Sequence, residues 1–361
     1  MISLVKKRFA RFWGSTRLFI KRHKWSISLI LLATLIIGFF VYDSLTGGTF
    51  TPGETPLKKK PVETRVPAPL SGLLTEPERA QRTPLAVVIE NHPEARPQSG
   101  LNKASLVYET FAEGGITRFL AVFQEEDVAD IGPVRSARVY FVEWANSHKA
   151  FFAHVGGNSD ALDLIQKFKV YDINQFYFGN YFWRDAKRYA PHNVYTTTDK
   201  LRAAGQSKSY PVTNAKNQSL IFKKQASEAE RPVDFSLKIN FNTSFAVTWS
   251  YSQKDNNFKR SMLGAKQVDK NTGEQVVAKN ILIGFSDFSN GKSRTGEQKV
   301  NIRTTGSGSA IMYIDGVKSS GTWKRPSQDS LIRFYDTSGS EVKLNPGTTW
   351  IEFVPTGTAV N

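Results

Sequence analysis

Short apolar runs alternate with amphipathic segments between residues 70 and 205. Runs rich in β-branched residues are typical of buried strands, and apolar positions that recur every three or four residues indicate helices. Glycine and proline separate these segments. The pattern predicts an α/β (α+β) region with a mixed sheet. Strands are expected over Leu85 to Ile89, Ala104 to Tyr108, Ile116 to Phe123, Ala150 to Val155 and Val194 to Thr198. Helices are expected over Val139 to His148 and Ala161 to Phe168. A third helix is expected to start from a cap at Thr198 or Asp199 and to run to Ala204.

The pattern changes after residue 231, where short alternating runs are split by Gly, Asn and Asp. Alternation of apolar and polar residues indicates half-buried strands. Asp315-Gly316 and Asp336 to Gly339 are typical of hairpin turns, and Gly306 to Ser309 is interpreted as a further turn. A predominantly antiparallel β domain is therefore predicted over residues 232–356, with a polar interdomain linker over 206–231.

An apolar segment without a charge runs from Trp25 to Tyr42. As a helix it would span roughly 27 Å, close to the ~30 Å hydrocarbon core of a bilayer. Residues 1–24 are basic and contain no acid, so the positive-inside rule predicts a single-pass protein of the cell membrane with a cytoplasmic N-terminus and an extracytoplasmic body. A cleaved signal peptide is the alternative, but the length of the run favours an uncleaved signal anchor. Residues 43–69, rich in Gly, Pro and Thr, are expected to be a linker.

The basic N-terminal segment carries eight Lys and Arg side chains, which account for half of the net charge of +16. The rest of the chain is only mildly basic, so no nucleic-acid partner is expected. The sequence has no cysteine, which excludes disulfides, a thiolate nucleophile and a lipid attached to cysteine. The body must therefore be held together by core packing alone.

Several unusual sequence blocks occur in a defined order: PLAVVIENHPEARPQSGL, ASLVYETFAEGGITRF, IGPVRSAR, FAHVGG, APHNVY, GTWKRPS and NPGTTWIEFVP. These blocks resemble the signature of the YerB-like family of bacterial cell-envelope proteins, over about Leu70 to Pro355. The resemblance implies an exported, membrane-attached protein with two domains, in a family whose biochemical role is uncharacterised. Members of the family are often lipoproteins, and this chain departs from them because it has no cysteine to acylate.

Charged and polar residues concentrate in these blocks and predict a binding surface at strand ends. In GPVRSAR, Ser136 is expected to cap a helix, with Arg135 and Arg138 beside its first turn, an arrangement that favours an anion. The alternative is a structural network in which both arginines pair with Glu109 or Glu113. The candidate ligand-binding residues are Arg96, Glu109, Glu113, Arg118, Arg135, Ser136, Arg138, His154, Arg188, His192 and Asn193, with Arg184 a further cation nearby.

Catalytic and metal-binding roles have weaker support. Glu109, Glu113 and His154, together with Glu90, are candidates for acid and base, but glycan cleavage requires two carboxyl groups that face one cleft. His92, His154 and His192 show no spacing typical of a zinc site, so structural hydrogen-bonded histidines are expected, with no metal and no cofactor.

The sequence therefore predicts a membrane-anchored envelope protein that binds an anionic or glycan ligand of the cell wall, or a partner protein, without catalysis. The alternative is a hydrolase or transferase that acts on a cell-wall polymer, with Glu109 or Glu113 as acid or base. The two hypotheses differ in geometry, because catalysis needs two of these groups in one open cleft, whereas a structural role places each glutamate in an arginine fork.

Overall fold

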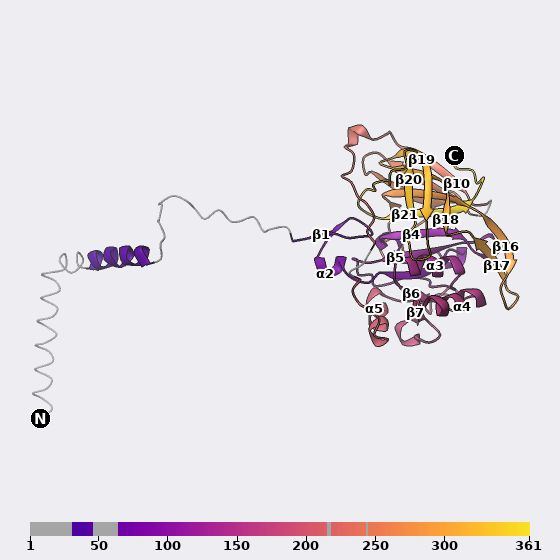
Figure 1. The fold of residues 1–361 in the computed structure, drawn as a ribbon, viewed down its shortest axis with the longest axis horizontal. Helices are drawn as coiled ribbons and strands as arrows, with labels where there is room; N and C mark the ends of the chain where they lie inside the picture. The colour runs from indigo at the N-terminus through magenta and orange to yellow at the C-terminus, as the bar shows by residue number, and fades with distance from the viewer. Residues whose placement is uncertain (1–30, 46–63, 215–217, 243–244) are drawn as a thin grey trace, which may run out of the picture. The chain divides into compact units, whose positions relative to one another are not determined.

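The computed structural model describes residues 31–45, 64–214, 218–242 and 245–361 (Figure 1). Its contacts divide the chain into two units, Met1–Glu63 and Thr64–Asn361. In the first unit, residues 31–45 form a helix with exposed apolar side chains.

The predicted membrane span is therefore described only from residue 31 onward. Residues 25–30 of that span, the basic segment 1–24 and residues 46–63 of the predicted linker lie outside the described residues. Among the helices that the structure describes, none is both long and apolar enough to cross a bilayer.

The second unit contains one large sheet that takes strands from both predicted regions. Apart from the edge strand β7, its N-terminal strands come from apolar runs that are buried on both faces, as central strands require. Their bounds are β3 (Leu85–Glu90), β4 (Leu106–Phe111), β5 (Thr117–Phe123), β6 (Phe151–His154) and β7 (Tyr171–Asn174). Its C-terminal strands are β15 (Asn280–Ser286), β18 (Gly306–Ile314), β19 (Val317–Arg325), β20 (Arg333–Asp336) and β21 (Thr349–Pro355).

The order of these ten strands is β20-β19-β18-β15-β21-β4-β5-β3-β6-β7. Strands β4, β5 and β3 pair antiparallel, whereas β3, β6 and β7 pair parallel, which makes the N-terminal part of the sheet mixed. Strands β15, β18, β19 and β20 pair antiparallel. The predicted fold class is thus confirmed for both regions.

Strand β21 joins the two parts of the sheet. It lies parallel to β15 on one side and parallel to β4 on the other. Between the two regions, the Leu220 N–H donates to the Pro69 carbonyl at 3.0 Å, and Phe222 forms a bridge with Leu344 and packs against the core. The sheet is consequently continuous across the predicted interdomain boundary.

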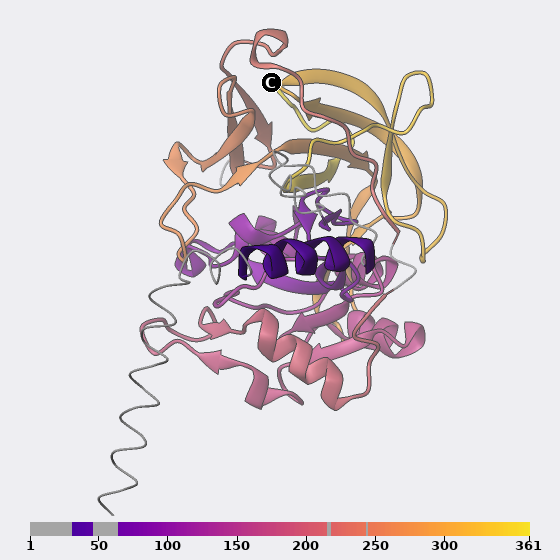
Figure 2. The same ribbon diagram turned by 90° about the vertical axis from the view of Figure 1, so that its left-hand side faces the viewer.

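Different elements cover the two faces of the large sheet. A second sheet, β10-β11-β12-β13 with β14 on β12, shares one core with Val87 and Phe119. Helices α3 and α4 share the other core with Val88 and Leu120. Figures 1 and 2 show the helical end and the C-terminal strands at opposite ends of this body. The strands of the second sheet are β10 (Phe235–Asn240), β11 (Ala246–Ser252), β12 (Asn257–Met262), β13 (Ala265–Lys266) and β14 (Val277–Ala278).

The remaining described elements are short. The helices are α2 (Pro77–Ala80), α3 (Val139–Ser147), α4 (Ser159–Phe168) and α5 (Thr198–Ser207), and the 3-10 turns are η1 (Pro93–Ala95), η2 (Leu101–Lys103), η3 (Glu113–Gly115), η4 (Gly179–Tyr181) and η5 (Glu228–Glu230). The remaining strands are β1 (Val66–Pro67), β2 (Leu74–Thr75), β8 (Trp183–Arg184), β9 (Val194–Tyr195), β16 (Phe288–Lys292) and β17 (Gln298–Ile302).

Two local predictions need correction. Gly306 to Ser309 begins strand β18 instead of forming a turn, because these residues pair with Thr322 to Arg325 of β19. Only glycine fits at position 308, where a Cβ would approach the Phe285 carbonyl oxygen to 2.4 Å. Helix α5 is capped by Thr197, whose hydroxyl accepts the Lys200 N–H at 2.9 Å, one residue before the predicted cap. The Asp315-Gly316 turn between β18 and β19 is confirmed, and both residues adopt positive φ, as a two-residue hairpin requires.

Candidate functional site

Three of the predicted arginines meet beside the ends of β3 and β5. Glu90 and Arg118 are direct cross-strand partners. The segment before α3 crosses over them, so that Arg135 donates from Nε to Glu90 at 2.9 Å and Arg118 donates to the Ser136 carbonyl at 3.0 Å. Arg138 donates from Nε to Glu113 at 2.6 Å. We call Arg118, Arg135 and Arg138 the arginine cluster.

The helix start differs from the sequence prediction. Arg138, not Ser136, occupies the N-cap position of α3, and no side chain caps the helix. Ser136 lies two residues earlier and contributes its carbonyl group to Arg118. The predicted structural network is present for Arg138 with Glu113, whereas Arg135 pairs with Glu90 and with neither Glu109 nor Glu113.

The arginine cluster keeps donors that no protein group satisfies. Arg118 is 8 % exposed, and its buried Nε has no hydrogen-bond partner among the described residues. Burial, reinforced by the positive charge of Arg138, lowers the pKa of Arg118 to about 10. Within the described part of the chain, the side chain of Arg135 makes one hydrogen bond, from Nε, and it is 23 % exposed. Three cations against Glu90 and Glu113 leave the cluster net positive.

Glu113 connects the arginine cluster to a pocket. Burial alone would raise the pKa of Glu113, but the hydrogen bond and charge of Arg138 lower it below its ordinary value. The pocket beside it has a volume of about 570 Å³. Phe111 and Phe288 supply apolar lining, and their ring centroids lie 6.3 Å apart. The polar lining comes from Glu113, the Gly114–Gly115 backbone, Asn242, Ser289, Asn290, Gln298 and Lys299.

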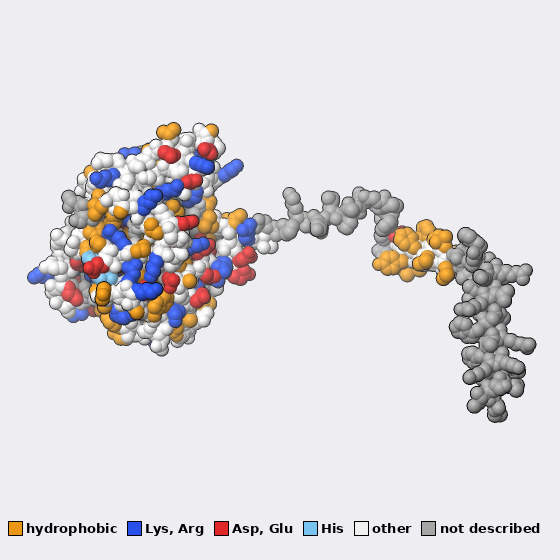
Figure 3. Space-filling view, turned by 180° about the vertical axis from the view of Figure 1, so that it is seen from behind, with side chains coloured by type: hydrophobic (Ala, Val, Ile, Leu, Met, Phe, Trp, Pro, Cys, Tyr) orange, Lys and Arg blue, Asp and Glu red, His pale blue; other side chains and the backbone are white. Residues whose placement is uncertain are grey.

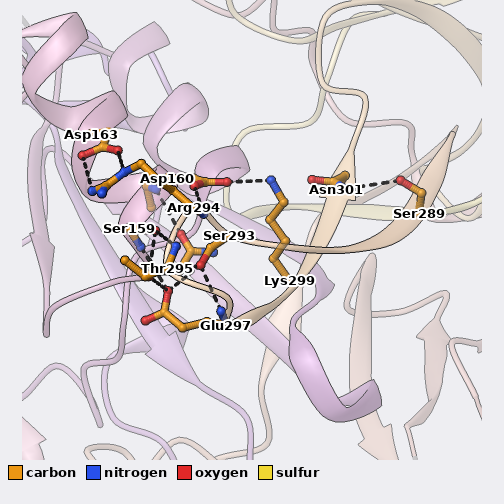
Figure 4. Close-up of polar contacts among 12 residues, drawn as sticks. Ser159, Asp160, Asp163, Ser289, Ser293, Arg294, Thr295, Glu297, Lys299 and Asn301 are labelled. Carbon is orange, nitrogen blue, oxygen red and sulfur yellow. Dashed lines mark hydrogen bonds and ion pairs between the residues drawn. The ribbon is translucent and has the colours of Figure 1, made fainter.

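One wall of the pocket is the β16–β17 hairpin, which is fastened to α4 (Figure 4). Lys299 donates to Asp160 at 2.6 Å, and the Arg294 backbone N–H donates to the same carboxylate at 2.8 Å. The hydrogen bond from Lys299, and to a smaller extent the one from the Arg294 N–H, lowers the pKa of Asp160. Glu297 accepts the Ser159 N–H at the start of α4 at 3.3 Å. The hairpin tip is thereby held over the first turn of that helix.

His154 lies apart from the arginine cluster and is fully buried in β6. Its Nδ1 lies 2.7 Å from the Gly156 carbonyl oxygen, and its Nε2 lies 2.7 Å from Asp172. Both ring nitrogens are therefore occupied by acceptors, which leaves neither for a substrate. This geometry favours a structural role for His154.

The remaining predicted residues lie in two neighbouring loops. Arg188 donates to the carbonyls of Glu94 and Pro97, at 3.1 and 2.8 Å, and so ties its own loop to η1. His192 lies between Glu90 and Glu94, with its Nδ1 2.8 Å from Glu90. In the space-filling view, histidine atoms lie among gathered Lys and Arg side chains on one face of the body (Figure 3).

Two other members of the predicted set bind within these loops. Arg184 donates to the side chain of Asn193 at 2.8 Å. Arg96 donates to Asn91 at 3.2 Å, and burial, followed by the charge of Arg260, lowers the pKa of Arg96.

Glu109 belongs to a buried charged group that the sequence prediction missed. It points to the opposite face of the sheet from Glu90 and Arg118, and Arg260 of β12 donates to both of its carboxylate oxygens at 2.8 and 2.7 Å. Glu352 of β21 is the lateral partner of Glu109, and the Trp249 indole donates to it at 2.9 Å. All three charged residues are fully buried.

The two carboxyl groups are cross-strand neighbours in this buried group. Burial, and then the nearby charge of Glu109, raises the pKa of Glu352 well above its ordinary value. Its Oε2 has no hydrogen-bond partner among the described residues. The guanidinium of Arg260 lies 5.1 Å from the centre of the Trp350 ring, a cation–π contact. A signal for this group exists in the sequence: Phe258, Arg260 and Met262 alternate on the inward face of one strand.

Similarity to known proteins covers most of the described body. Residues 70–211 match the family described as "Protein of unknown function (DUF3048) N-terminal domain", and residues 237–351 match the corresponding C-terminal domain. The chain is 34 % identical over 295 residues to "Putative lipoprotein YerB" of Bacillus subtilis (strain 168), covering 81 % of this chain and 87 % of that protein. A crystal structure of the YerB protein from Bacillus subtilis is similar with a TM-score of 0.74 at 33 % identity, covering 82 % of this chain and all of that one.

Proposed function

The chain belongs to the DUF3048 family, and we propose that it binds an anionic glycan polymer of the cell envelope without catalysis. Its similarity to the YerB relative confirms the resemblance noted in the sequence. The observation that carries this proposal is the arginine cluster: among the described residues, Arg118 Nε has no hydrogen-bond partner and the Arg135 side chain bonds only through its Nε. Guanidinium groups with free donors suit phosphate or carboxylate oxygens.

The pocket beside Glu113 supports a glycan as the remainder of this ligand. Its aromatic lining offers apolar faces for sugar rings, and its side-chain amides offer donors and acceptors for hydroxyl groups. Glu113 lines the pocket and binds Arg138, so one polymer could place an anionic group on the arginines and a neighbouring sugar in the pocket.

The location of the protein is part of the same proposal. The lipoprotein name of the YerB relative supports an envelope protein attached to a membrane. The present sequence has no cysteine to carry a lipid, so we propose residues 25–42 as its anchor, with residues 1–24 in the cytoplasm and the body outside.

The hydrolase alternative loses support from the geometry. Glu109 is fully buried and held by Arg260, whereas Glu113 lies on the pocket wall and is held by Arg138. Two carboxyl groups that flank one glycosidic bond must both reach the substrate. Each glutamate instead lies in an arginine fork.

The test compares Arg135→Ala with the unchanged full-length chain in detergent, on purified cell-wall polymer and on the same polymer stripped of its anionic groups. A charge-assisted hydrogen bond is worth ~1.5–3 kcal/mol, so binding to the anionic polymer should weaken roughly 10- to 150-fold. The melting temperature should change little, because Glu90 keeps His192 as a second partner.

Arg138→Ala is the matched structural control. Its removal leaves Glu113 without its arginine partner and should lower the melting temperature of the ligand-free protein. Equal binding of wild type and Arg135→Ala, or equal binding to stripped and anionic polymer, would contradict the proposed function.

A further inference from the structure

Two histidines and a glutamate converge where η1 meets the loop that precedes β9. His92 caps η1, Glu94 lies within it, and His192 comes from the second loop. One ligand atom from each of these side chains lies within 4.8 Å of the other two. The two imidazole rings are stacked, with centroids 4.8 Å apart and an angle of 14° between their planes.

A hydrogen bond to Glu90 orients His192 toward Glu94, whereas His92 Nδ1 accepts the Glu94 backbone N–H at 3.3 Å. Glu90 accepts from His192 Nδ1 at 2.8 Å, and its other oxygen is fixed by Arg135. His192 Nε2 then faces Glu94 Oε2 at 3.1 Å. A carboxylate behind the distal nitrogen of a histidine ligand is a common outer-shell feature of zinc sites.

We propose that His92, Glu94 and His192 bind one divalent transition-metal ion, with zinc as the best match to the donor set. Two histidines and one glutamate form a known three-residue ligand set for zinc, which leaves a fourth position for water or a ligand. Bonds of ~2.0–2.2 Å require ligand atoms roughly 3.3–3.5 Å apart in a tetrahedron. The side chain of Glu94 is 71 % exposed, so it can close the remaining distance, and the site is open to the solvent.

The loops that carry these ligands are held in place independently of any metal. Arg188 joins them through the carbonyls of Glu94 and Pro97, and Lys270 binds Asp185 at the start of the second loop at 3.0 Å. The ligands therefore sit on a braced frame, which reduces the ordering that metal binding would require. The simpler alternative is a protonated His192 that bridges Glu90 and Glu94 without a metal.

Zinc titration of the full-length protein in detergent, after removal of metals with a chelator, tests the proposal. We expect one equivalent of zinc to bind and to raise the melting temperature. Glu90→Gln, which changes none of the three proposed ligands, should weaken binding roughly 10- to 100-fold, and His92→Ala, Glu94→Gln and His192→Ala should each weaken it further. Substitution with cobalt should give a visible absorption band that is lost in the same variants.

Glu126→Gln serves as the control, because Glu126 is a carboxylate outside the site that pairs with Lys103. It should leave zinc affinity unchanged. No saturable zinc binding in the wild type would overturn the proposal and favour the protonated His192 bridge. Zinc binding that Glu94→Gln and His192→Ala leave unchanged would also overturn it, since the ion would then be held elsewhere on the chain.

Discussion

At the scale of single residues, this protein buries charges inside strands that read as apolar. Glu109 and Glu352 occur within the runs LVYETF and TWIEFVP, and Arg260 lies between Phe258 and Met262. The alternation of each strand places these side chains in the core, so their burial could be predicted from the sequence. Their mutual contact could not, because the three strands are far apart along the chain.

The first prediction concerns the raised pKa of Glu352 beside Glu109. Glu352→Gln keeps a donor for Glu109 and an acceptor for Trp249, but it removes the titration. A carboxyl group whose pKa is higher in the folded state than in the unfolded state stabilises the fold when it is protonated. This contribution to the free energy of unfolding is complete at pH values below the pKa of the unfolded state, here 4.5. As the pH rises toward the folded pKa, the wild type should lose unfolding free energy, by up to ~1.4 kcal/mol per pH unit. The advantage of Glu352→Gln over the wild type should therefore grow from about pH 5 to about pH 7, measured by urea unfolding.

Glu109→Gln provides the contrast, because it leaves Arg260 as an unpaired buried cation. It should cost ~3–5 kcal/mol of unfolding free energy. A stability difference between Glu352→Gln and wild type that stays constant with pH would show that Glu352 is not protonated in the folded protein.

At the scale of elements, local pattern identified the central strands and the helices better than the sheet edges. Strands β3, β5 and β6 and helices α3 and α4 lie within two or three residues of their predicted bounds. Strand β7 was missed, and β19 was indicated only by the hairpin turn at Asp315-Gly316, since β19 is mostly exposed and carries no apolar run. The β16–β17 hairpin, which forms a wall of the pocket, was only partly anticipated, because polar contacts with α4 hold its tip in place.

The second prediction tests that attachment. The Lys299–Asp160 pair is about 20 % exposed on both sides, whereas Arg294 and Asp163 are more than half exposed. Asp160→Asn should therefore loosen the hairpin and speed amide hydrogen exchange over residues 288–302 about 5-fold, equivalent to ~1 kcal/mol of local stability. Asp163→Asn, the matched control on the next turn of α4, should change exchange less. Equal exchange in both variants and the wild type would mean that the polar contacts of the tip do not hold the hairpin.

At the scale of the whole molecule, the sequence predicted two regions of different character but not the way in which they are joined. The family match divides the chain between residues 211 and 237, near the predicted linker. Strand β21 nevertheless pairs with β4, and Arg260 binds Glu109, so both hydrogen bonds and charges cross that division. Pairing between strands more than 200 residues apart leaves no local sequence signal.

The last prediction follows from this continuity: the body should unfold in one step. Phe141 of α3 is fully buried in the core on the helical face of the sheet, and Phe141→Ala should cost ~3–5 kcal/mol. If both regions form one cooperative unit, the slowest-exchanging amides of β11, in the second sheet, should lose the same free energy of protection as those of β5. Hydrogen exchange with mass spectrometry measures both strands in one experiment.

Phe176→Ala, at an exposed aromatic residue, is the control and should change the free energy of protection of neither strand by more than ~0.5 kcal/mol. Two separate transitions, with only the N-terminal one shifted by Phe141→Ala, would establish independent domains, because a cooperative body cannot lose protection in β5 while β11 keeps it.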